Sequence, residues 1–289
     1  MKLASLILLG VALAAALVCS RGKVLGTTLM AGWWWSLCSL AAIITVELLA
    51  LAGSGGTQSQ GIEHARFFAA VTTFAPTMAL LGAKRPQHRA WQFIVASLLI
   101  VLWLPGFEAI LYRPGAPLEL HTTRRWFMLL LMLVALFNGL PARDWPSSVL
   151  YFLAQACLLG PYLPLAEYAE MRAMPLVGLT LWAAAAGLRA SGLPRRPNGQ
   201  AAFDRLWLDF RDTYGMLWGL RVCERWNATA KAGDWNVRLR WAGLADASGQ
   251  PPHRLDPKER DAALRQLGSL LQRFVSRSWI AERLGDSLD

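Results

Sequence analysis

Seven long apolar runs, separated by short polar or charged stretches, fill most of the first 190 residues and constrain the fold more than any other feature. They cover residues 3–20, 29–52, 67–82, 91–111, 126–140, 147–165 and 174–188. A helix needs about 20 apolar residues, with a range of roughly 17–25, to cross the hydrocarbon core of a bilayer. The pattern therefore predicts an all-α multi-pass membrane helix bundle of about seven spans. The run at 126–140 is the weakest, because it is short.

The acidic residues divide the chain into two parts. Only seven of the 19 Asp and Glu residues lie within residues 1–200, and the other twelve lie within residues 201–289. Between the two parts, residues 193–200 are rich in Pro, Gly, Arg and Asn, a composition that is typical of a linker. We therefore expect a transmembrane domain at 1–192, a linker at 193–200 and a small, mainly helical soluble domain at 201–289.

The net charge of +10 belongs almost wholly to the first part. Basic proteins often bind nucleic acid, but here the excess lies in short loops between apolar runs, where Lys and Arg set membrane orientation. We therefore expect a lipid bilayer as partner, and no nucleic acid. If the first run is a span with its N-terminus outside, nine loop cations lie inside and six outside. This bias favours the inner membrane and a cytosolic C-terminal domain.

Two features leave the topology open. Residues 1–20 also resemble a signal peptide, since Lys2 precedes an apolar stretch with several alanines; Arg21 and Lys23 favour a retained span instead. If the run at 126–140 does not cross, every later segment changes side and the C-terminal domain lies outside.

Several ionisable side chains are expected near the outer face and form the candidate site. Within apolar runs such groups are costly and are often functional. The candidate cluster consists of Glu47, His64, Glu108, His121 and Arg124. Two carboxylates with a histidine could perform acid–base chemistry or hold a cation. The alternative is that these groups reach the lipid headgroups and pair with one another.

Three consecutive tryptophans, Trp33, Trp34 and Trp35, begin the second run. Tryptophan prefers the membrane interface, where its ring is buried and its N–H stays hydrated. We interpret the triplet as an interfacial anchor. A haem platform is disfavoured, because no Asp or His lies nearby.

No cofactor and no metal site is expected. The four histidines, His64, His88, His121 and His253, are far apart, and no ligand spacing typical of zinc links them to one another or to the four cysteines. The sequence Gly53-Ser54-Gly55-Gly56 lacks the Gly-Lys-Ser/Thr end of a phosphate-binding loop.

The soluble domain is predicted to contain a helix, a strand and a second helix. Residues 201–231 have helical apolar spacing, residues 235–241 alternate with period two, residues 242–252 are expected to form a loop, and residues 256–284 a helix beginning at Asp256-Pro257. One strand cannot form a stable sheet alone. We therefore expect it to pair with a strand not recognised in the sequence or with a partner chain, and the domain to lean on the membrane part or on a partner protein.

Three functions remain compatible with these features. The leading hypothesis is a non-catalytic accessory or assembly subunit whose residues 201–289 dock on a partner, because the spans contain few ionisable groups. The first alternative is a transporter or permease, because prolines lie in several spans and because Glu47 and Glu108 could form a pair of carboxylates. The second is a membrane-embedded enzyme acting at the outer face through Glu108 and His121. The oligomeric state is left open.

Overall fold

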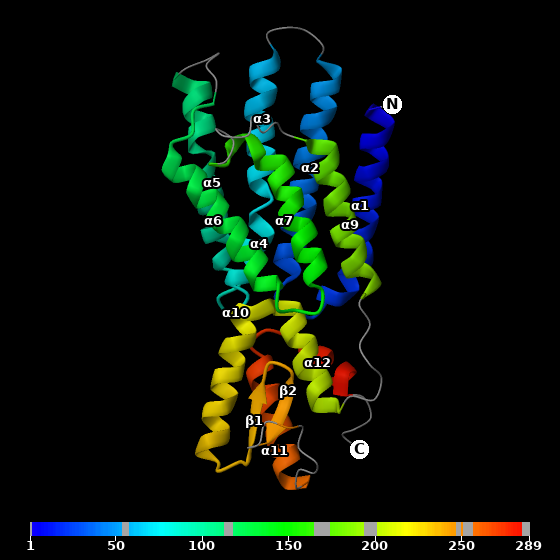
Figure 1. The fold of residues 1–289 in the computed structure, drawn as a ribbon, viewed down its shortest axis with the longest axis vertical. Coiled ribbons are helices and arrows are strands. Elements are labelled where there is room, and N and C mark those ends of the chain that lie inside the picture. The colour runs from blue at the N-terminus through cyan, green and yellow to red at the C-terminus, as the bar shows by residue number, and fades with distance from the viewer. Residues whose placement is uncertain are drawn as a thin grey trace.

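The computed structural model shows an all-α helical bundle joined end to end with a smaller unit that contains the only two strands among the described residues (Figure 1). It describes residues 2–53, 58–112, 118–164, 174–193, 201–246, 250 and 257–284. The N-terminus lies at the end of the bundle far from the smaller unit. Most of the predicted linker, residues 194–200, lies outside the described part.

Each predicted apolar run forms a helix of the bundle. The helices are α1 (Lys2–Val24), α2 (Met30–Ala52), α3 (Gln58–Thr72), α4 (Ala75–Leu81), α5 (Trp91–Tyr112), α6 (Thr122–Gly139), α7 (Trp145–Leu159) and α9 (Pro175–Ser191), with a 3₁₀ turn, η1 (Gly160–Tyr162), after α7. Among the described residues, only α1, α2 and α5 are both long enough and apolar enough to cross a membrane. The helix bundle predicted from the sequence is confirmed, whereas the number of seven spans is not.

Helix length explains the difference for two of the predicted spans. Helices α7 and α9 have 15 and 17 residues, which correspond to about 22 and 26 Å at 1.5 Å per residue. Both fall short of the roughly 30 Å of the hydrocarbon core. Helix α7 ends early because Pro161 and Pro164 follow it, and α9 ends at Gly192, which has a positive φ of 72°.

The third run differs from its prediction in both its start and its continuity. The helix begins at Gln58, nine residues before the predicted start, because polar residues of its first turns precede the apolar run. The chain then leaves the helix at residues 73–74 and resumes as α4, which has Pro76 in its first turn. A proline lacks the amide hydrogen that an unbroken helix requires.

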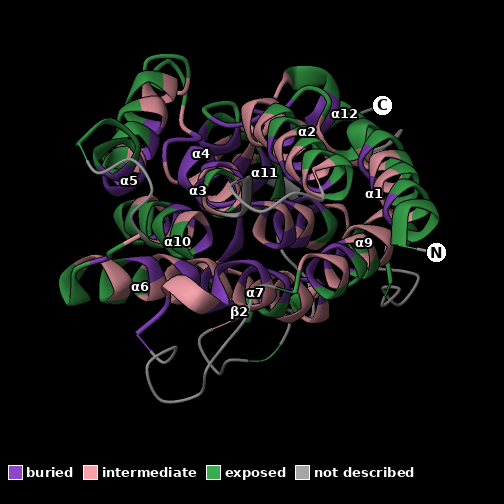
Figure 2. Cartoon of the chain, turned by 90° about the horizontal axis from the view of Figure 1, so that it is seen from above, coloured by how far each residue is buried: buried purple, intermediate pink, exposed green. Residues whose placement is uncertain are grey.

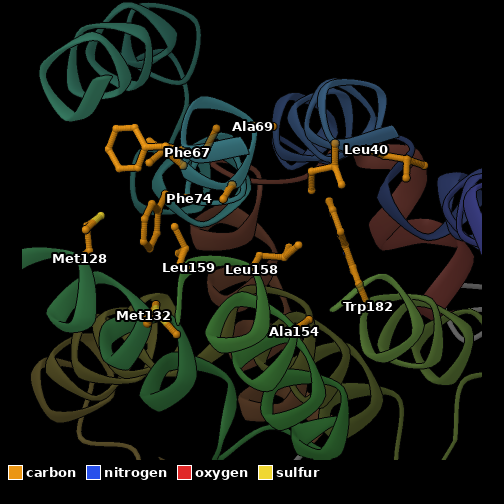
Figure 3. Packing of buried hydrophobic residues seen from close by; sticks show 14 of the residues in the cluster. Leu40, Phe67, Ala69, Phe74, Met128, Met132, Ala154, Leu158, Leu159 and Trp182 are labelled. Atoms are coloured by element: carbon orange, nitrogen blue, oxygen red, sulfur yellow. The ribbon is translucent and has the colours of Figure 1, made fainter. Parts of the chain in front are cut away.

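The bundle core is apolar and centres on the broken α3–α4 segment. Phe67 and Phe74 from this segment lie between Met128 of α6 and Leu159 of α7 (Figure 3). All four side chains are at most 1% exposed. A second hydrophobic cluster lies in the smaller unit and also includes Ala83 from the bundle. The two clusters therefore meet at the loop after α4.

The smaller unit contains a hairpin where the sequence predicted one strand and a loop. Strand β1 (Val237–Arg240) pairs antiparallel with β2 (Gly243–Asp246), so that Val237 faces Asp246. The alternation predicted for the first strand is confirmed, because Val237 and Leu239 are buried and the intervening arginines are exposed. The loop predicted at 242–252 is wrong for 243–246: Gly243, at φ 135°, allows the tight return that the pattern did not reveal.

The last predicted helix is also interrupted. Helix α11 (Pro257–Leu271) and α12 (Arg277–Leu284) are separated by residues 272–276, whereas the sequence predicted one helix over 256–284. The intervening backbone bonds to the bundle instead of continuing the helix: the Thr28 amide donates to Phe274 O (3.0 Å) and the Ser276 amide to Gly26 O (2.6 Å). The predicted cap, Asp256, lies outside the described residues.

Helix α10 (Ala202–Ala232) connects the smaller unit to the bundle and is broken at Gly215, whose φ of 75° and ψ of −166° are not helical. Asn138 at the end of α6 fits into this break. Its side chain accepts a hydrogen bond from the Leu217 amide (2.9 Å) and donates one to Tyr214 O (3.4 Å). A side chain of the bundle therefore satisfies backbone groups that the break in α10 exposes.

Replacing Gly215 with alanine is expected to lower the unfolding temperature of the purified protein. A Cβ at this position would lie 2.3 Å from Asn138 Nδ2 and 2.6 Å from Asn138 O, on a backbone with positive φ. Such strain costs about 1–3 kcal/mol. The control is Gly268→Ala in α11, where nothing lies within 4 Å of the added Cβ; it should be neutral or stabilising. Equal unfolding temperatures for the two variants would contradict the strained break.

Candidate functional site

The break between α3 and α4 exposes backbone carbonyls inside the bundle. Pro76 has no N–H to donate to Thr72 O, and neighbouring helices supply the missing donors. Ser39 Oγ of α2 donates to Thr72 O (2.8 Å), Tyr151 Oη of α7 donates to Thr73 O (2.6 Å), and Gln155 Nε2 of α7 donates to both Thr73 O and Thr73 Oγ1 (3.2 Å each). The break therefore places a group of polar side chains within an otherwise apolar core.

A cavity leads from this polar group to the junction with the smaller unit. It consists of two adjoining hollows of about 210 and 240 Å³. They share nine lining residues: Leu17, Ser20, Ser36, Pro76, Leu80, Asp144, Arg189, Asp212 and Thr213. Helices α1, α2, α4, α7, α9 and α10 all contribute to the lining, so the cavity lies at the centre of the molecule.

One face of α7 lines the inner end of the cavity. Ser147, Tyr151 and Gln155 follow one another at four-residue intervals, which places them on the same side of a helix. Gln155 is 1% exposed and Ser147 is 6% exposed. Gln155 Oε1 and Ser147 Oγ have no hydrogen-bond partner in the described part of the protein. Buried polar atoms in this condition are uncommon and usually mark a place for water or a ligand.

Paired charges surround the outer end of the cavity. Arg189 Nε lies 3.2 Å from Asp144 Oδ2, and Arg143 Nε lies 3.8 Å from Asp212 Oδ2. Asp212 also accepts hydrogen bonds from the Arg143 amide (3.1 Å) and from Arg211 Nη2 (2.7 Å). The Arg143–Asp212 pair joins the loop between α6 and α7 to α10. One charge pair within the bundle and one between the bundle and the smaller unit therefore lie at the mouth of the cavity.

Hydrogen bonds from aromatic side chains fix the smaller unit against the bundle near the cavity. Trp218 Nε1 donates to Leu80 O (2.9 Å), and Trp241 Nε1 donates to Pro141 O (3.0 Å). Tyr214 Oη donates to Phe274 O (2.8 Å) and lies 3.1 Å from Thr28 Oγ1. Burial raises the pKa of Tyr214 to about 12, so this phenol is neutral at physiological pH.

The composition of the inner lining is typical of a small-molecule binding site. Within the described ranges, no group of three or more His, Cys, Asp or Glu residues could hold a metal ion. The inner lining offers hydroxyls and an amide, together with the aromatic rings of Phe152 and Trp182. Predominantly apolar walls with a few well-placed polar groups are typical of small-molecule sites.

Of the five residues in the cluster predicted at the outer face, Glu47 takes part in an ion pair, and its partner lies outside the cluster. Glu47 forms a bidentate pair with Arg66, with distances of 2.7 Å to Nε and 2.9 Å to Nη2. His64 is buried. Glu108 and His121 are exposed. Among the described residues, the side chains of Glu108, His121 and Arg124 form no hydrogen bond or ion pair. The partner of Glu47 is thus Arg66, which was not a member of the predicted cluster.

The three tryptophans of α2 lie in different environments. Trp33 is buried and donates to Leu17 O (2.7 Å). Trp35 is partly buried and donates to Gln92 Oε1 (2.8 Å). Trp34 is 56% exposed. Of the triplet predicted to be an interfacial anchor, Trp34 therefore has the exposure that this role needs, whereas the other two indole N–H groups bond within the protein.

The sequence analysis did not identify Ser147 and Gln155, because it sought only ionisable groups within the apolar runs. A signal was present: Ser147, Tyr151 and Gln155 form one polar face in the run at 147–165. An uncharged amide in the middle of a span needs hydrogen-bond partners as much as a charge does. Pro76 in the third run supplied the other half of the signal.

The stability of the protein is expected to fall between pH 10 and pH 12 because of Tyr214. Its pKa is higher in the folded state than in the unfolded state, so the neutral phenol stabilises the fold below about pH 10, and this contribution is lost as the pH rises through about 12. Across this window the wild type should lose about 1 kcal/mol per pH unit more than Tyr214→Phe in chemical denaturation. The other tyrosines are common to both proteins, so parallel curves would contradict this role of Tyr214.

No family model, curated protein or solved structure matches this chain. The geometry of the cavity and its lining residues is therefore the basis on which a function has to be inferred.

Proposed function

We propose that this chain is a multi-pass protein of the inner membrane that binds a small polar solute in the central cavity and belongs to the functional class of transporters and permeases. The observation that carries the proposal is the cavity itself, which extends from the charged junction with the smaller unit to the broken α3–α4 helix. This function was the first alternative in the sequence analysis. The prolines that suggested it now have a structural counterpart at Pro76.

The distribution of exposed apolar side chains supports a membrane location for the bundle. All but two of the exposed large hydrophobic residues of the described part lie before residue 194, and the two exceptions, Leu217 and Leu220, lie in α10. Exposed side chains cover the outward sides of α1 and α5, while buried ones face the interior (Figure 2). Soluble proteins rarely expose continuous apolar surfaces of this kind. In this proposal, α1, α2, α5, α6, α7, α9 and the broken α3–α4 pair make seven crossings, and the bilayer accommodates the short helices α7 and α9 by local thinning.

Charge supports the proposed orientation. Arg21, Lys84, Arg85 and Arg89 lie at the end of the bundle that contacts the smaller unit, and Arg21, Arg85 and Arg89 are exposed. Lys and Arg are enriched in cytoplasmic loops. We therefore propose that the smaller unit is cytosolic and that the N-terminus lies outside, with Glu47 and Arg66 near the outer end.

Broken helices are a known device for building solute sites in membranes. Unwound backbone is tolerated at membrane depth where it is buried in protein or lines a cavity, and several transporter folds place their substrates at such breaks. Here Thr77 and Pro76, immediately after the break, both line the cavity. The break thus lies next to the space in which a solute would bind.

The two other hypotheses have less support from the geometry. The accessory-subunit hypothesis rested on spans with few ionisable groups and on a tail expected to depend on a partner, and the strand of that tail pairs with β2 of the same chain. The enzyme hypothesis required Glu108 and His121 to converge, and no side-chain hydrogen bond between them occurs among the described residues. Co-purification of a stoichiometric partner protein remains the test of the accessory role.

Cysteine labelling tests whether the cavity is hydrated and open toward the smaller unit. In a background in which Cys19, Cys38, Cys157 and Cys223 are replaced, Ser147→Cys and Thr77→Cys are treated with a charged thiol reagent that does not cross membranes. Both should react in inside-out vesicles, because both residues line the cavity, and Thr77→Cys should react faster, because Thr77 is partly exposed whereas Ser147 is buried. Occlusion by a bound solute should slow both reactions.

The control is Ile100→Cys, on the outward side of α5, where the side chain is 53% exposed. If the bundle is in a bilayer, this thiol faces hydrocarbon and should not react with the reagent. A reporter fused to the C-terminus identifies the side on which the smaller unit lies. Equal reactivity of the Ile100 and Ser147 variants would refute the membrane-embedded cavity.

A further inference from the structure

Two polar atoms of the cavity lining, Gln155 Oε1 and Ser147 Oγ, have no hydrogen-bond partner among the described residues, and they indicate which class of solute could bind. This inference rests on the proposed function. Gln155 already uses its Nε2 on Thr73, so the free atom is Oε1, which can only accept. Ser147 Oγ can both donate and accept. A ligand that satisfies both atoms needs at least one donor and a second group that donates or accepts. A molecule with several hydroxyl groups has this combination.

Charge argues against an ionised ligand. The residues that line the inner end, Ser36, Thr77, Ser148, Tyr151 and Gln155, carry no charge at neutral pH. An ion placed among them would lose its hydration without gaining a counter-ion, which is costly. At the outer end, Arg189 and Asp144 pair with each other, as do Arg143 and Asp212. Lys23 also lines this outer end and donates to Arg189 O, so an ionised ligand is disfavoured at the inner end, where Ser147 and Gln155 lie.

The remaining walls fit the carbon skeleton of such a molecule. Phe152 and Trp182 line the inner hollow, and the Trp182 ring meets that of Tyr151 edge to face with centroids 5.7 Å apart. Apolar walls with a few polar groups that fix orientation are the usual composition of a small-molecule site. The hydroxyls would meet one face of α7, while the C–H groups would meet the aromatic side chains.

We propose that the cavity binds a small neutral polyol, such as a sugar, through hydrogen bonds from its hydroxyl groups to Gln155 Oε1 and Ser147 Oγ. The hydroxyls could belong to a free solute or to the headgroup of a neutral glycolipid, since the recognising chemistry is the same. The free solute is the primary expectation because the mouth of the cavity is lined by charged residues of the junction.

The first experiment measures equilibrium binding of radiolabelled glycerol, glucose and sucrose to the full-length protein. The detergent should be of the polyoxyethylene type, because maltoside and glucoside detergents carry sugar headgroups that would compete. Glutamate, glycine betaine and inorganic phosphate serve as charged probes. We expect saturable binding of at least one neutral probe and none of the charged probes. A glucosyl diacylglycerol in nanodiscs, competing with free glucose, distinguishes the lipid source from the free one.

The matched variants are Ser147→Ala and Gln155→Leu. Ser147 Oγ has no partner in the described part of the protein, so Ser147→Ala should leave the unfolding temperature unchanged or raise it, yet weaken binding about tenfold. Gln155→Leu should abolish binding but also release Thr73, so its fold must be verified separately. Ser97→Ala, on an exposed position of α5, should bind as the wild type does.

Two groups of outcomes overturn the inference. Binding of charged probes alone would refute the polyol class while the proposed solute site survives. Neutral binding that Ser147→Ala and Gln155→Leu both leave unchanged would refute the site at these two residues. If no probe of any charge binds and Ser147→Cys also fails to react with the thiol reagent, the cavity holds only water and both proposals fail. Where a neutral probe does bind, its uptake into proteoliposomes separates a permease, which transports the probe, from a receptor, which only binds it.

Discussion

The missing amide hydrogen of Pro76 is the constraint on which the interior of the bundle depends. It leaves Thr72 O without its helical donor, and the helix remains open at residues 73–74. Because the surroundings are apolar, Ser39, Tyr151 and Gln155 must supply donors from two other helices. Those polar side chains prevent hydrocarbon-like packing around the break, and the cavity lies where that packing stops. A single backbone defect thus accounts for both the buried polar group and the space beside it.

The smaller unit depends on the bundle through hydrogen bonds that cross the junction in both directions. Asn138 of α6 bonds to backbone groups on either side of Gly215, while Trp218 and Trp241 donate to carbonyls of the bundle. The sequence analysis expected the tail to lean on the membrane part or on a partner, and the observed contacts are of the first kind. The strand that the sequence left without a partner pairs with β2 of the same chain.

The parts of the fold that follow from local periodicity could be predicted from the sequence. Apolar runs gave the bundle helices, and alternation gave β1 with its buried and exposed faces. The interruptions at Gly215 and residues 272–276 could not be predicted, because they depend on contacts with segments distant in the chain. The break at residues 73–74 has a local cause in Pro76, but the side chains that donate to its carbonyls come from distant helices. Leu217, predicted to continue the apolar stripe of α10, is 38% exposed because the break changes the phase of the helix. The site was missed for the related reason that its members are uncharged and come together only through the broken helix.

The capping of α10 by Asn138 has a consequence for the order in which the molecule is made. Helix α6 is synthesised about 80 residues before the segment of α10 that Asn138 caps. Until α10 and Trp241 have been synthesised, Asn138 and the carbonyls of Leu80 and Pro141 lack these hydrogen-bond partners. Completion of the bundle is therefore deferred to the end of synthesis. A chain that stalls or is cleaved in the linker would leave these groups uncapped at the end of the bundle.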